Sequence, residues 1–257
     1  MKISIITVCY NSEKTIESTI KSVLSQMYYD IEYIIIDGGS ADSTLNIIRK
    51  YQTLFKQRLL FISEPDYGLY DAMNKGIDMS TGELIGILNS DDTFFSDKVV
   101  DNIVTFHKKN NIDASIANII QQNNRGETVR FYSSKNWEPN KLKLGYMPPH
   151  PSIFFRRELF SKYGKYILSL KIAADYELIL RYFLIHKISW KYYNITTTSM
   201  LVGGLSSSGF SSYKLITKEI SQALLMNGIA NPTWKLNLRF VWKLYSILRV
   251  MYNRNIH

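Results

Sequence analysis

The feature that most constrains the fold is the regular alternation of short apolar runs and amphipathic stretches in the first 90 residues. Four apolar runs are typical of strands that are covered on both faces: residues 3–9, 33–36, 59–62 and 84–88. Between them, three stretches carry apolar residues at the 3.6-residue helical spacing: residues 16–27, 43–55 and 71–79. Strand–helix–strand repetition with short connections predicts an α/β fold with a mostly parallel, doubly wound sheet.

Polar residues follow each of these four runs, where each predicted strand ends. In chain order they are Tyr10 and Asn11, Asp37, Glu64 and Asp66, and Asp91 and Asp92. In an open parallel sheet, ligands bind beyond the carboxyl ends of the strands. The sequence therefore predicts a metal and phosphate site at this edge.

The segment from residue 89 to residue 92, Asn-Ser-Asp-Asp, carries the strongest chemical signal. Two adjacent carboxylates just past a buried strand repel each other and resist desolvation. Their oxygen atoms suit Mg²⁺ or Mn²⁺, which commonly bridge to substrate phosphates. The alternative is a helix cap, with Ser90 or Asp91 starting a helix that runs through Val99 and Phe106.

Composition favours one globular domain, because 257 residues with 46% hydrophobic content can bury a sizeable core and no Pro-, Gly- or Ser-rich linker interrupts them. Cys9 is the single cysteine, which excludes an intrachain disulfide and fits a reducing compartment. We expect it to be a core residue. No signal peptide and no run of about 18 apolar residues is evident, so we expect a chain that is soluble or lies on a membrane surface.

The second half is less regular. We expect strands over residues 112–120, 128–132 and 152–155, and a helix that begins at residue 174 and continues through Leu184. Residues 147–151 form a proline-rich loop before the third of these strands. The glycines at 203 and 204 begin a flexible loop, whose N–H groups could approach phosphates or could simply be mobile.

Six motifs occur in an order and spacing that is specific, although each alone is weak. They are Ile5-Ile6-Thr7-Val8-Cys9-Tyr10-Asn11, Ile36-Asp37-Gly38-Gly39-Ser40-Ala41-Asp42-Ser43-Thr44, Glu64-Pro65-Asp66-Tyr67-Gly68-Leu69-Tyr70-Asp71-Ala72-Met73-Asn74-Lys75-Gly76, Leu88-Asn89-Ser90-Asp91-Asp92, His150-Pro151-Ser152 and Ala174-Asp175-Tyr176-Glu177. Together they resemble the motifs of family 2 glycosyltransferases with the GT-A fold, over roughly residues 1–215. The resemblance implies an inverting transfer of a sugar from a nucleotide donor.

The resemblance also implies a set of residues that bind the donor: Thr7, Tyr10, Asn11, Asp37, Asp66, Asn74, Lys75 and Asp91. Many relatives carry paired acids where this chain has Asp37-Gly38, which puts the contact to the base in doubt. The alternative for Asp37 is a turn-forming role before two glycines, and that for Lys75 is a solvated position on a helix face.

By the same resemblance, Asp91 and Asp92 form the DXD-type motif that holds Mn²⁺ or Mg²⁺ on the donor diphosphate. Asp175 corresponds to the catalytic base that removes the proton of the acceptor hydroxyl. Its alternative is a carboxylate that is stabilised by the helix dipole. His150 is a weaker candidate for the metal or diphosphate, with a structural loop histidine as the alternative.

The net charge of the chain, +9, is concentrated in its C-terminal stretch. No acidic residue occurs from residue 220 to residue 257, but five basic ones do: Lys235, Arg239, Lys243, Arg249 and Arg254. Asn231 and Pro232 predict the start of an amphipathic helix with a basic face. Such a helix suits an anionic membrane surface, with packing on the protein's own core as the alternative.

We therefore divide the chain into residues 1–215, a GT-A domain, and residues 216–257, a basic amphipathic tail. Within the domain, we expect residues 1–110 to bind the nucleotide and residues 111–215 to bind the acceptor.

The motifs are similar to those of bacterial O-antigen enzymes, which implies transfer of a hexose, glucose or galactose, from a UDP-sugar to a GlcNAc-diphospho-undecaprenol acceptor, with a β-linkage. This predicts a cytoplasmic enzyme that associates peripherally with the inner face of the cell membrane and does not bind nucleic acid. The rivals are a nucleotidyltransferase that acts on sugar phosphates and a non-catalytic basic protein that binds membranes or nucleic acid. The first normally needs a Gly-rich, basic phosphate loop after its first strand, which Tyr10-Asn11-Ser12-Glu13 is not.

Overall fold

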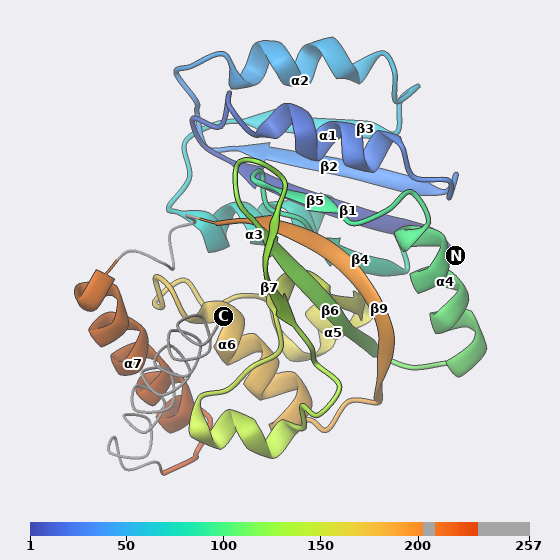
Figure 1. The fold of residues 1–257 in the computed structure, drawn as a ribbon. Coiled ribbons are helices and arrows are strands. Elements are labelled where there is room, and N and C mark those ends of the chain that lie inside the picture. The colour runs from blue at the N-terminus through green and yellow to red at the C-terminus, as the bar shows by residue number, and fades with distance from the viewer. Residues whose placement is uncertain (203–208, 231–257) are drawn as a thin grey trace, which may run out of the picture.

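The computed structural model describes residues 1–202 and 209–230 as an α/β fold built around one curled, nine-stranded sheet (Figure 1). The strand order is β3-β2-β1-β4-β8-β6-β9-β5, and β7 pairs with β6 beside this path. The first four strands are β1 (Ile3–Cys9), β2 (Ile31–Asp37), β3 (Leu59–Ser63) and β4 (Leu84–Ile87). They run parallel to one another, as the sequence predicted.

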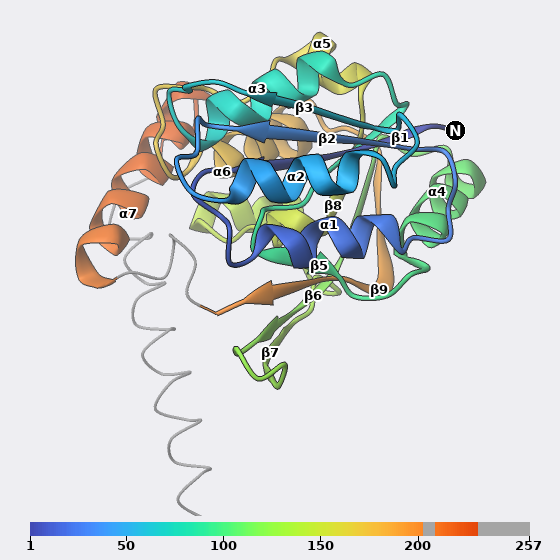
Figure 2. The ribbon, with the colours of Figure 1, turned by 90° about the horizontal axis from the view of Figure 1, so that it is seen from above.

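Helices cover both faces of this parallel half (Figure 2). On one face lie α1 (Ile16–Leu24) and α2 (Thr44–Gln52), and on the other lies α3 (Leu69–Met79). Alternate residues of β1 point to opposite faces of the sheet. Ile5 packs in the cluster that contains residues of α1 and α2, whereas Ile6 packs in the cluster that contains residues of α3. This explains why the strands are apolar at nearly every position.

The second half of the sheet is mixed, so the prediction of a mostly parallel sheet is wrong there. The strands are β5 (Asp92–Phe94), β6 (Ala114–Gln122), β7 (Thr128–Tyr132), β8 (Ile153–Arg156) and β9 (Trp190–Leu201). Four of the eight pairings in the described chain are antiparallel: β4 with β8, β5 with β9, and β6 with β7 and with β8. An apolar run shows that a strand is buried, but not the direction of its neighbour.

The remaining helical elements are α4 (Val99–Asn110), η1 (Pro139–Leu144), η2 (His150–Ser152), α5 (Glu158–Tyr163), α6 (Ala174–Ile179), η3 (Leu180–Ile185) and α7 (Gly209–Met226). Strand β5 lies between the acidic segment and α4, whose N-terminal cap position is Lys98. The alternative in which Ser90 or Asp91 caps this helix is therefore wrong. The acidic segment follows β4, and its last residue, Asp92, begins β5.

Helix α7 runs across residue 215, where the predicted domain ends, and its Ile220, Ala223 and Leu224 belong to the same buried cluster as α3 and α6. The amphipathic tail predicted from residue 231 onward and the glycine pair at 203 and 204 lie outside the described residues. Within the described ranges, no helix is both long and apolar enough to cross a bilayer.

Gly76 sets the distance between α3 and the sheet. A Cβ atom at this position would lie 2.5 Å from Cγ2 of Ile6 on β1. Because the glycine has no side chain, α3 packs directly on β1.

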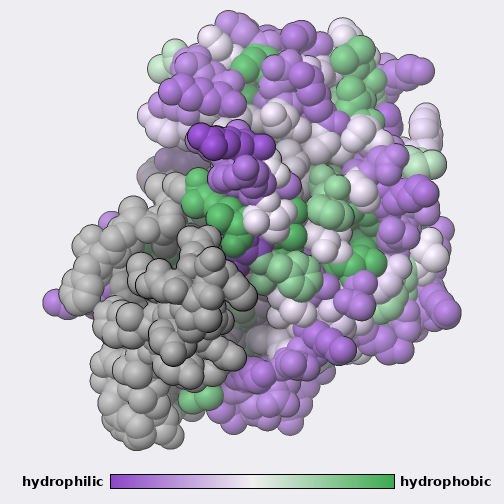
Figure 3. Space-filling view, in the orientation of Figure 1, coloured by the Kyte–Doolittle hydropathy of each residue, from purple (hydrophilic) through white to green (hydrophobic). Residues whose placement is uncertain are grey.

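The face shown in Figure 3 is mostly hydrophilic in its upper and lower parts, with small groups of hydrophobic residues across its middle. The β6–β7 hairpin extends from the sheet on this side (Figure 1). Its outer strand exposes Val129 and Phe131, each 56% accessible, on either side of Arg130.

Candidate active site

The loops that follow β1, β2 and β4 contact one another at the carboxyl edge of the parallel strands. The backbone N–H of Asn11, after β1, donates to Oγ of Ser40, after β2, and Oδ1 of Asn11 accepts from the N–H of Ala41. Oγ of Ser12 lies 3.0 Å from Oγ of Ser90, after β4. The predicted polar edge is therefore one connected surface.

Asp37 ends β2 with its side chain fully buried. Its carboxylate accepts hydrogen bonds from the N–H groups of Gly39 and Ser40 and from the hydroxyls of Ser40 and Ser63. Although burial raises the pKa of Asp37, the bonds from the two serines bring it below its usual value. This placement supports the turn-forming role of Asp37, because its buried carboxylate already accepts these four hydrogen bonds from the protein.

Gly38 makes room for another acid. A Cβ atom at residue 38 would lie 2.6 Å from Oδ2 of Asp66 and 3.5 Å from Cδ2 of Tyr10. Oδ1 of Asp66 accepts the N–H of Gly68, which holds the carboxylate over the glycine. Asp66 therefore brings a carboxylate to the space beside Asp37 that a side chain at residue 38 would occupy. Tyr10, 65% exposed, offers a ring face next to it.

Three other residues of the predicted donor set have partners within the protein, and their contact with the donor stays a prediction. Thr7 is fully buried in β1 and accepts a bond from the hydroxyl of Tyr33, which argues against a side-chain contact with a nucleoside. The amide of Asn74 exchanges two hydrogen bonds with the backbone of Tyr166 (2.9 and 3.0 Å). The ammonium of Lys75 pairs with Glu64 at 2.8 Å, which ties α3 to the loop after β3.

Burial raises the pKa values of both carboxyl groups in the acidic turn after β4. Asp92 is 1% exposed, and burial, followed by repulsion from Asp91, raises the pKa of Asp92 to about 8. Burial also raises the pKa of Asp91. Nδ2 of Asn89 donates to Oδ2 of Asp92, whereas Oδ1 of Asn89 is buried without a hydrogen-bond partner.

These groups fit a hard divalent cation. Two carboxylates and an orphaned amide oxygen converge within four residues, and a cation would relieve both the repulsion and the missing bond. The described residues contain no group of three or more His, Cys, Asp or Glu that could hold a metal by themselves. This agrees with Mg²⁺-type sites in which one or two carboxylates and substrate phosphates complete the shell.

Asp175 lies in the first turn of α6 and is partly buried. Its Oδ1 accepts from the hydroxyl of Tyr70 at 3.1 Å and from the N–H of Tyr176 at 2.7 Å. Burial raises the pKa of Asp175 above its usual value, against the opposing effect of His150. A carboxylate with a raised pKa and one oxygen without a bond to the described residues is suited to remove a proton.

His150 begins η2 and is 8% exposed. Its Nε2 lies 2.7 Å from the hydroxyl of Tyr166, and burial lowers its pKa, opposed by the charge of Asp175. The structure thus groups His150 with Asp175 and Tyr166, which supports the structural alternative. Its predicted contact with the metal or diphosphate stays a prediction.

Cys9 takes no part in this chemistry. Its thiol is buried 3.5 Å from Oδ1 of Asp37, and burial raises its pKa, so the prediction of a core residue is confirmed.

Sequence reasoning missed Tyr70, Tyr166 and Glu219 as residues that surround Asp175 and the segment before it. Glu219, on α7, accepts bonds from three consecutive N–H groups at residues 171–173, directly before α6. Tyr70 lies inside a motif that the sequence displays, but only its proximity to Asp175, 105 residues away, reveals its use.

A profile of the family described as "Glycosyl transferase family 2" matches residues 4–165, well over half of the chain. The protein belongs to this family, and it is a glycosyltransferase with a GT-A-like fold.

Among similar proteins, a "PGL/p-HBAD biosynthesis glycosyltransferase" of Mycobacterium bovis is 27% identical over 228 residues, which span 87% of this chain and 84% of the relative. An "uncharacterized glycosyltransferase" of Mycobacterium tuberculosis is 34% identical over 184 residues, 70% of this chain and 68% of the relative.

Solved structures share the fold at low identity. TarS of S. aureus, residues 1–349 in complex with UDP-GlcNAc, superposes with a TM-score of 0.69 at 19% identity, over 88% of this chain and 67% of that chain. The mannosyltransferase PcManGT of Pyrobaculum calidifontis, in complex with GDP-Man and Mn²⁺, gives a TM-score of 0.65 at 17% identity, over 91% and 67%.

Proposed function

We propose that this protein is an inverting hexosyltransferase that moves glucose or galactose from a UDP-sugar to a lipid-linked saccharide, of the GlcNAc-diphospho-undecaprenol type, in O-antigen or surface polysaccharide synthesis. The observation that carries the proposal is the pairing of an acidic, partly orphaned turn at Asp91 and Asp92 with a separate carboxylate of raised pKa, Asp175. TarS, which shares the fold, binds UDP-GlcNAc, and this supports a nucleotide-sugar donor, for which the proposal takes the uridine form.

In the proposed reaction, Asp175 removes the proton of the acceptor hydroxyl through Oδ2 as the acceptor oxygen forms a bond to the anomeric carbon. The bond from this carbon to the diphosphate oxygen breaks, and its electron pair leaves with the nucleoside diphosphate. Asp91 and Asp92, together with Oδ1 of Asn89, would hold a divalent cation, Mn²⁺ or Mg²⁺, which offsets the charge on the leaving diphosphate.

The direct test is incubation of the purified protein with each UDP-sugar, Mn²⁺ and a synthetic GlcNAc-diphosphate-lipid, followed by mass and linkage analysis of the product. We expect transfer from UDP-glucose or UDP-galactose and a β-linked disaccharide. Calorimetry should show UDP binding only weakly without the cation. If no nucleotide sugar is consumed and no UDP binds, the proposal fails. Transfer with retention of configuration would overturn the inverting mechanism alone.

The position of Asp66 leads to a prediction about donor binding. Gly38→Ala should push the Asp66 carboxylate off its site, because the new Cβ atom would occupy its place. We expect UDP affinity to fall about tenfold or more, the cost of one hydrogen bond to a charged group. Asp66→Asn should cause a similar loss, and the double variant should lose little more than either. Calorimetry with UDP measures each affinity.

The control is Asp78→Asn at the far end of α3, where the carboxylate is exposed and pairs with Lys165. It should bind UDP as the wild type does. Unchanged affinity in Gly38→Ala would show that the Asp66 carboxylate does not contact the donor.

The proposed membrane association rests on the basic sequence after residue 230. Deletion of residues 232–257 should reduce binding to vesicles that contain anionic lipid by at least about tenfold, since each Lys or Arg near such a surface contributes about 1 kcal/mol. Vesicle co-sedimentation at low and high salt measures this. Neutral vesicles are the control. Equal binding by the full-length and truncated proteins would contradict the proposal.

A further inference from the structure

The two hydrogen bonds to Asp175 are unequally distributed over its carboxylate. Both known donors, the hydroxyl of Tyr70 and the N–H of Tyr176, approach Oδ1, at 3.1 and 2.7 Å. Among the described residues, leaving out the side chains at 209–213, Oδ2 accepts no hydrogen bond. The carboxylate is thus held by one oxygen and presents the other, which is the arrangement that a positioned base requires.

Tyr70 has two acceptors for one proton. Its hydroxyl lies 2.7 Å from the carbonyl oxygen of Ile172 and 3.1 Å from Oδ1 of Asp175. A phenolic hydroxyl donates to one acceptor at a time. When Asp175 is ionised, the proton can turn to Oδ1 in a charge-assisted bond. Once Asp175 is protonated, the proton can turn to Ile172, so the buried hydroxyl keeps a partner in both states of the base.

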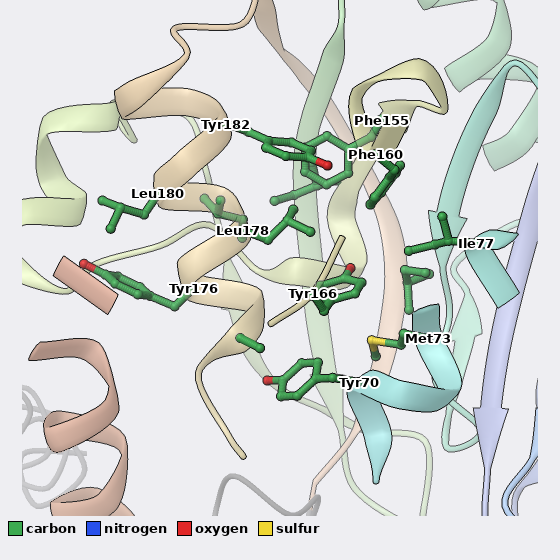
Figure 4. Packing of buried hydrophobic residues seen from close by; sticks show 14 of the residues in the cluster. Tyr70, Met73, Ile77, Phe155, Phe160, Tyr166, Tyr176, Leu178, Leu180 and Tyr182 are labelled. Atoms are coloured by element: carbon green, nitrogen blue, oxygen red, sulfur yellow. The ribbon is translucent and has the colours of Figure 1, made fainter. Parts of the chain in front are cut away.

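The ring of Tyr70 is held in one orientation. It is 6% exposed and stacks on Tyr166, with ring centroids 5.5 Å apart and an interplanar angle of 28°. Tyr166 is in turn clamped through its backbone by Asn74, one turn along α3 from Tyr70, and through its hydroxyl by His150. Figure 4 shows the two rings together, with the hydroxyl of Tyr70 directed towards the start of α6.

The segment directly before α6, at residues 171–173, is also held in place. Glu219 of α7, 5% exposed, accepts the N–H groups of Lys171, Ile172 and Ala173 at 2.8–3.0 Å. These bonds hold the segment that carries both the Ile172 carbonyl and the first turn of α6. Three helices, α3, α6 and α7, therefore converge on the position of a single carboxylate.

We propose that Tyr70 is a positioning residue that holds Oδ1 of Asp175 and directs Oδ2 towards the acceptor hydroxyl. This inference rests on the proposed function, in which Asp175 is the base. Tyr70 does not contact the reacting atoms. It acts through Asp175, by keeping the carboxylate oriented and by stabilising its ionised form.

The test is Tyr70→Phe, which removes only the hydroxyl and keeps the ring stack. We expect kcat to fall about tenfold or more, the cost of a hydrogen bond to a charged group, with the KM for the donor and the Kd for UDP unchanged. The matched control is Tyr182→Phe, which removes another buried hydroxyl, bonded to the carbonyl of Gly164. It should lose comparable thermal stability but retain its kcat.

A double-mutant cycle shows whether Tyr70 acts through Asp175. In the Asp175→Asn background, Tyr70→Phe should have little further effect, because the base that it positions is gone. An unchanged kcat in Tyr70→Phe, or an equal loss in both backgrounds, would overturn the inference. In either case the wild type would still transfer sugar, whereas a wild type that uses no nucleotide sugar would refute the proposed function itself.

Discussion

Asp175→Asn is expected to lower kcat for sugar transfer by about 10²–10⁴-fold, the range that a positioned general base contributes. An amide keeps the shape of the side chain and can still accept from Tyr70 and Tyr176, but it cannot take a proton. UDP affinity should be unchanged. Steady-state transfer assays together with calorimetry separate the two effects.

The control is Asp101→Asn, which changes an exposed acid in the first turn of α4, the position that Asp175 has in α6. It should leave kcat as it is. In the wild type, kcat should decline as the pH falls through the raised pKa of Asp175, because only the ionised carboxylate acts as a base. A variant that transfers normally, or one that loses UDP binding alone, would rule out the role of base.

Asp92→Asn should reduce transfer by about 100-fold or more, because the divalent cation loses a charged ligand and with it several kcal/mol of transition-state stabilisation. The cation must displace a proton from Asp92 below pH 8, since burial and Asp91 raise the pKa of Asp92 to about 8 in the metal-free protein. Mn²⁺ affinity of the wild type should therefore rise as the pH increases towards 8. Calorimetry in two buffers of different ionisation enthalpy detects the released proton.

The same substitution should stabilise the metal-free protein at high pH. The folded-state pKa of Asp92 lies above the unfolded value of 3.8, so the wild type loses stability as the pH rises from about 4 to about 8. Asparagine carries no charge to bury and can still accept from Asn89. Above pH 8 we expect a higher midpoint of thermal unfolding in Asp92→Asn than in the wild type.

Asp97→Asn, an exposed acid five residues further along, is the matched control and should change neither transfer nor stability. Wild-type transfer by Asp92→Asn would remove the basis for the metal site. A lower unfolding midpoint in this variant above pH 8 would instead show that Asp92 is stabilised by a partner in its ionised form.

Much of the parallel half of the sheet was predictable from local pattern. The strands at residues 3–9 and 84–87 and the helix that ends at Met79 lie where the apolar periodicity placed them, because each is a short element with a continuous buried face. The convergence of Asp37, Asp66 and Asp91 on one edge follows from the parallel order of their strands.

The contacts of individual side chains were not predictable. Asn74 and Thr7 matched a family motif, yet the folded chain uses Asn74 to hold Tyr166 and buries Thr7 against Tyr33. The carboxylate of Asp66 lies over Gly38, in the loop after another strand, and is held there by the N–H of Gly68. A sequence motif gives the place of a residue along the chain. The partner of its side chain depends on which other segment packs against it in the folded protein.

By itself, the sequence determined the elements of the parallel half, the edge at which its polar residues gather and the two carboxylates at 91 and 92, because periodicity and strand ends are local properties. Only the tertiary structure decided the antiparallel second half, the burial that raises the pKa of Asp92 and the meeting of Tyr70 with Asp175. Strand direction, desolvation and contacts across 105 residues depend on packing between segments, and no local pattern encodes them.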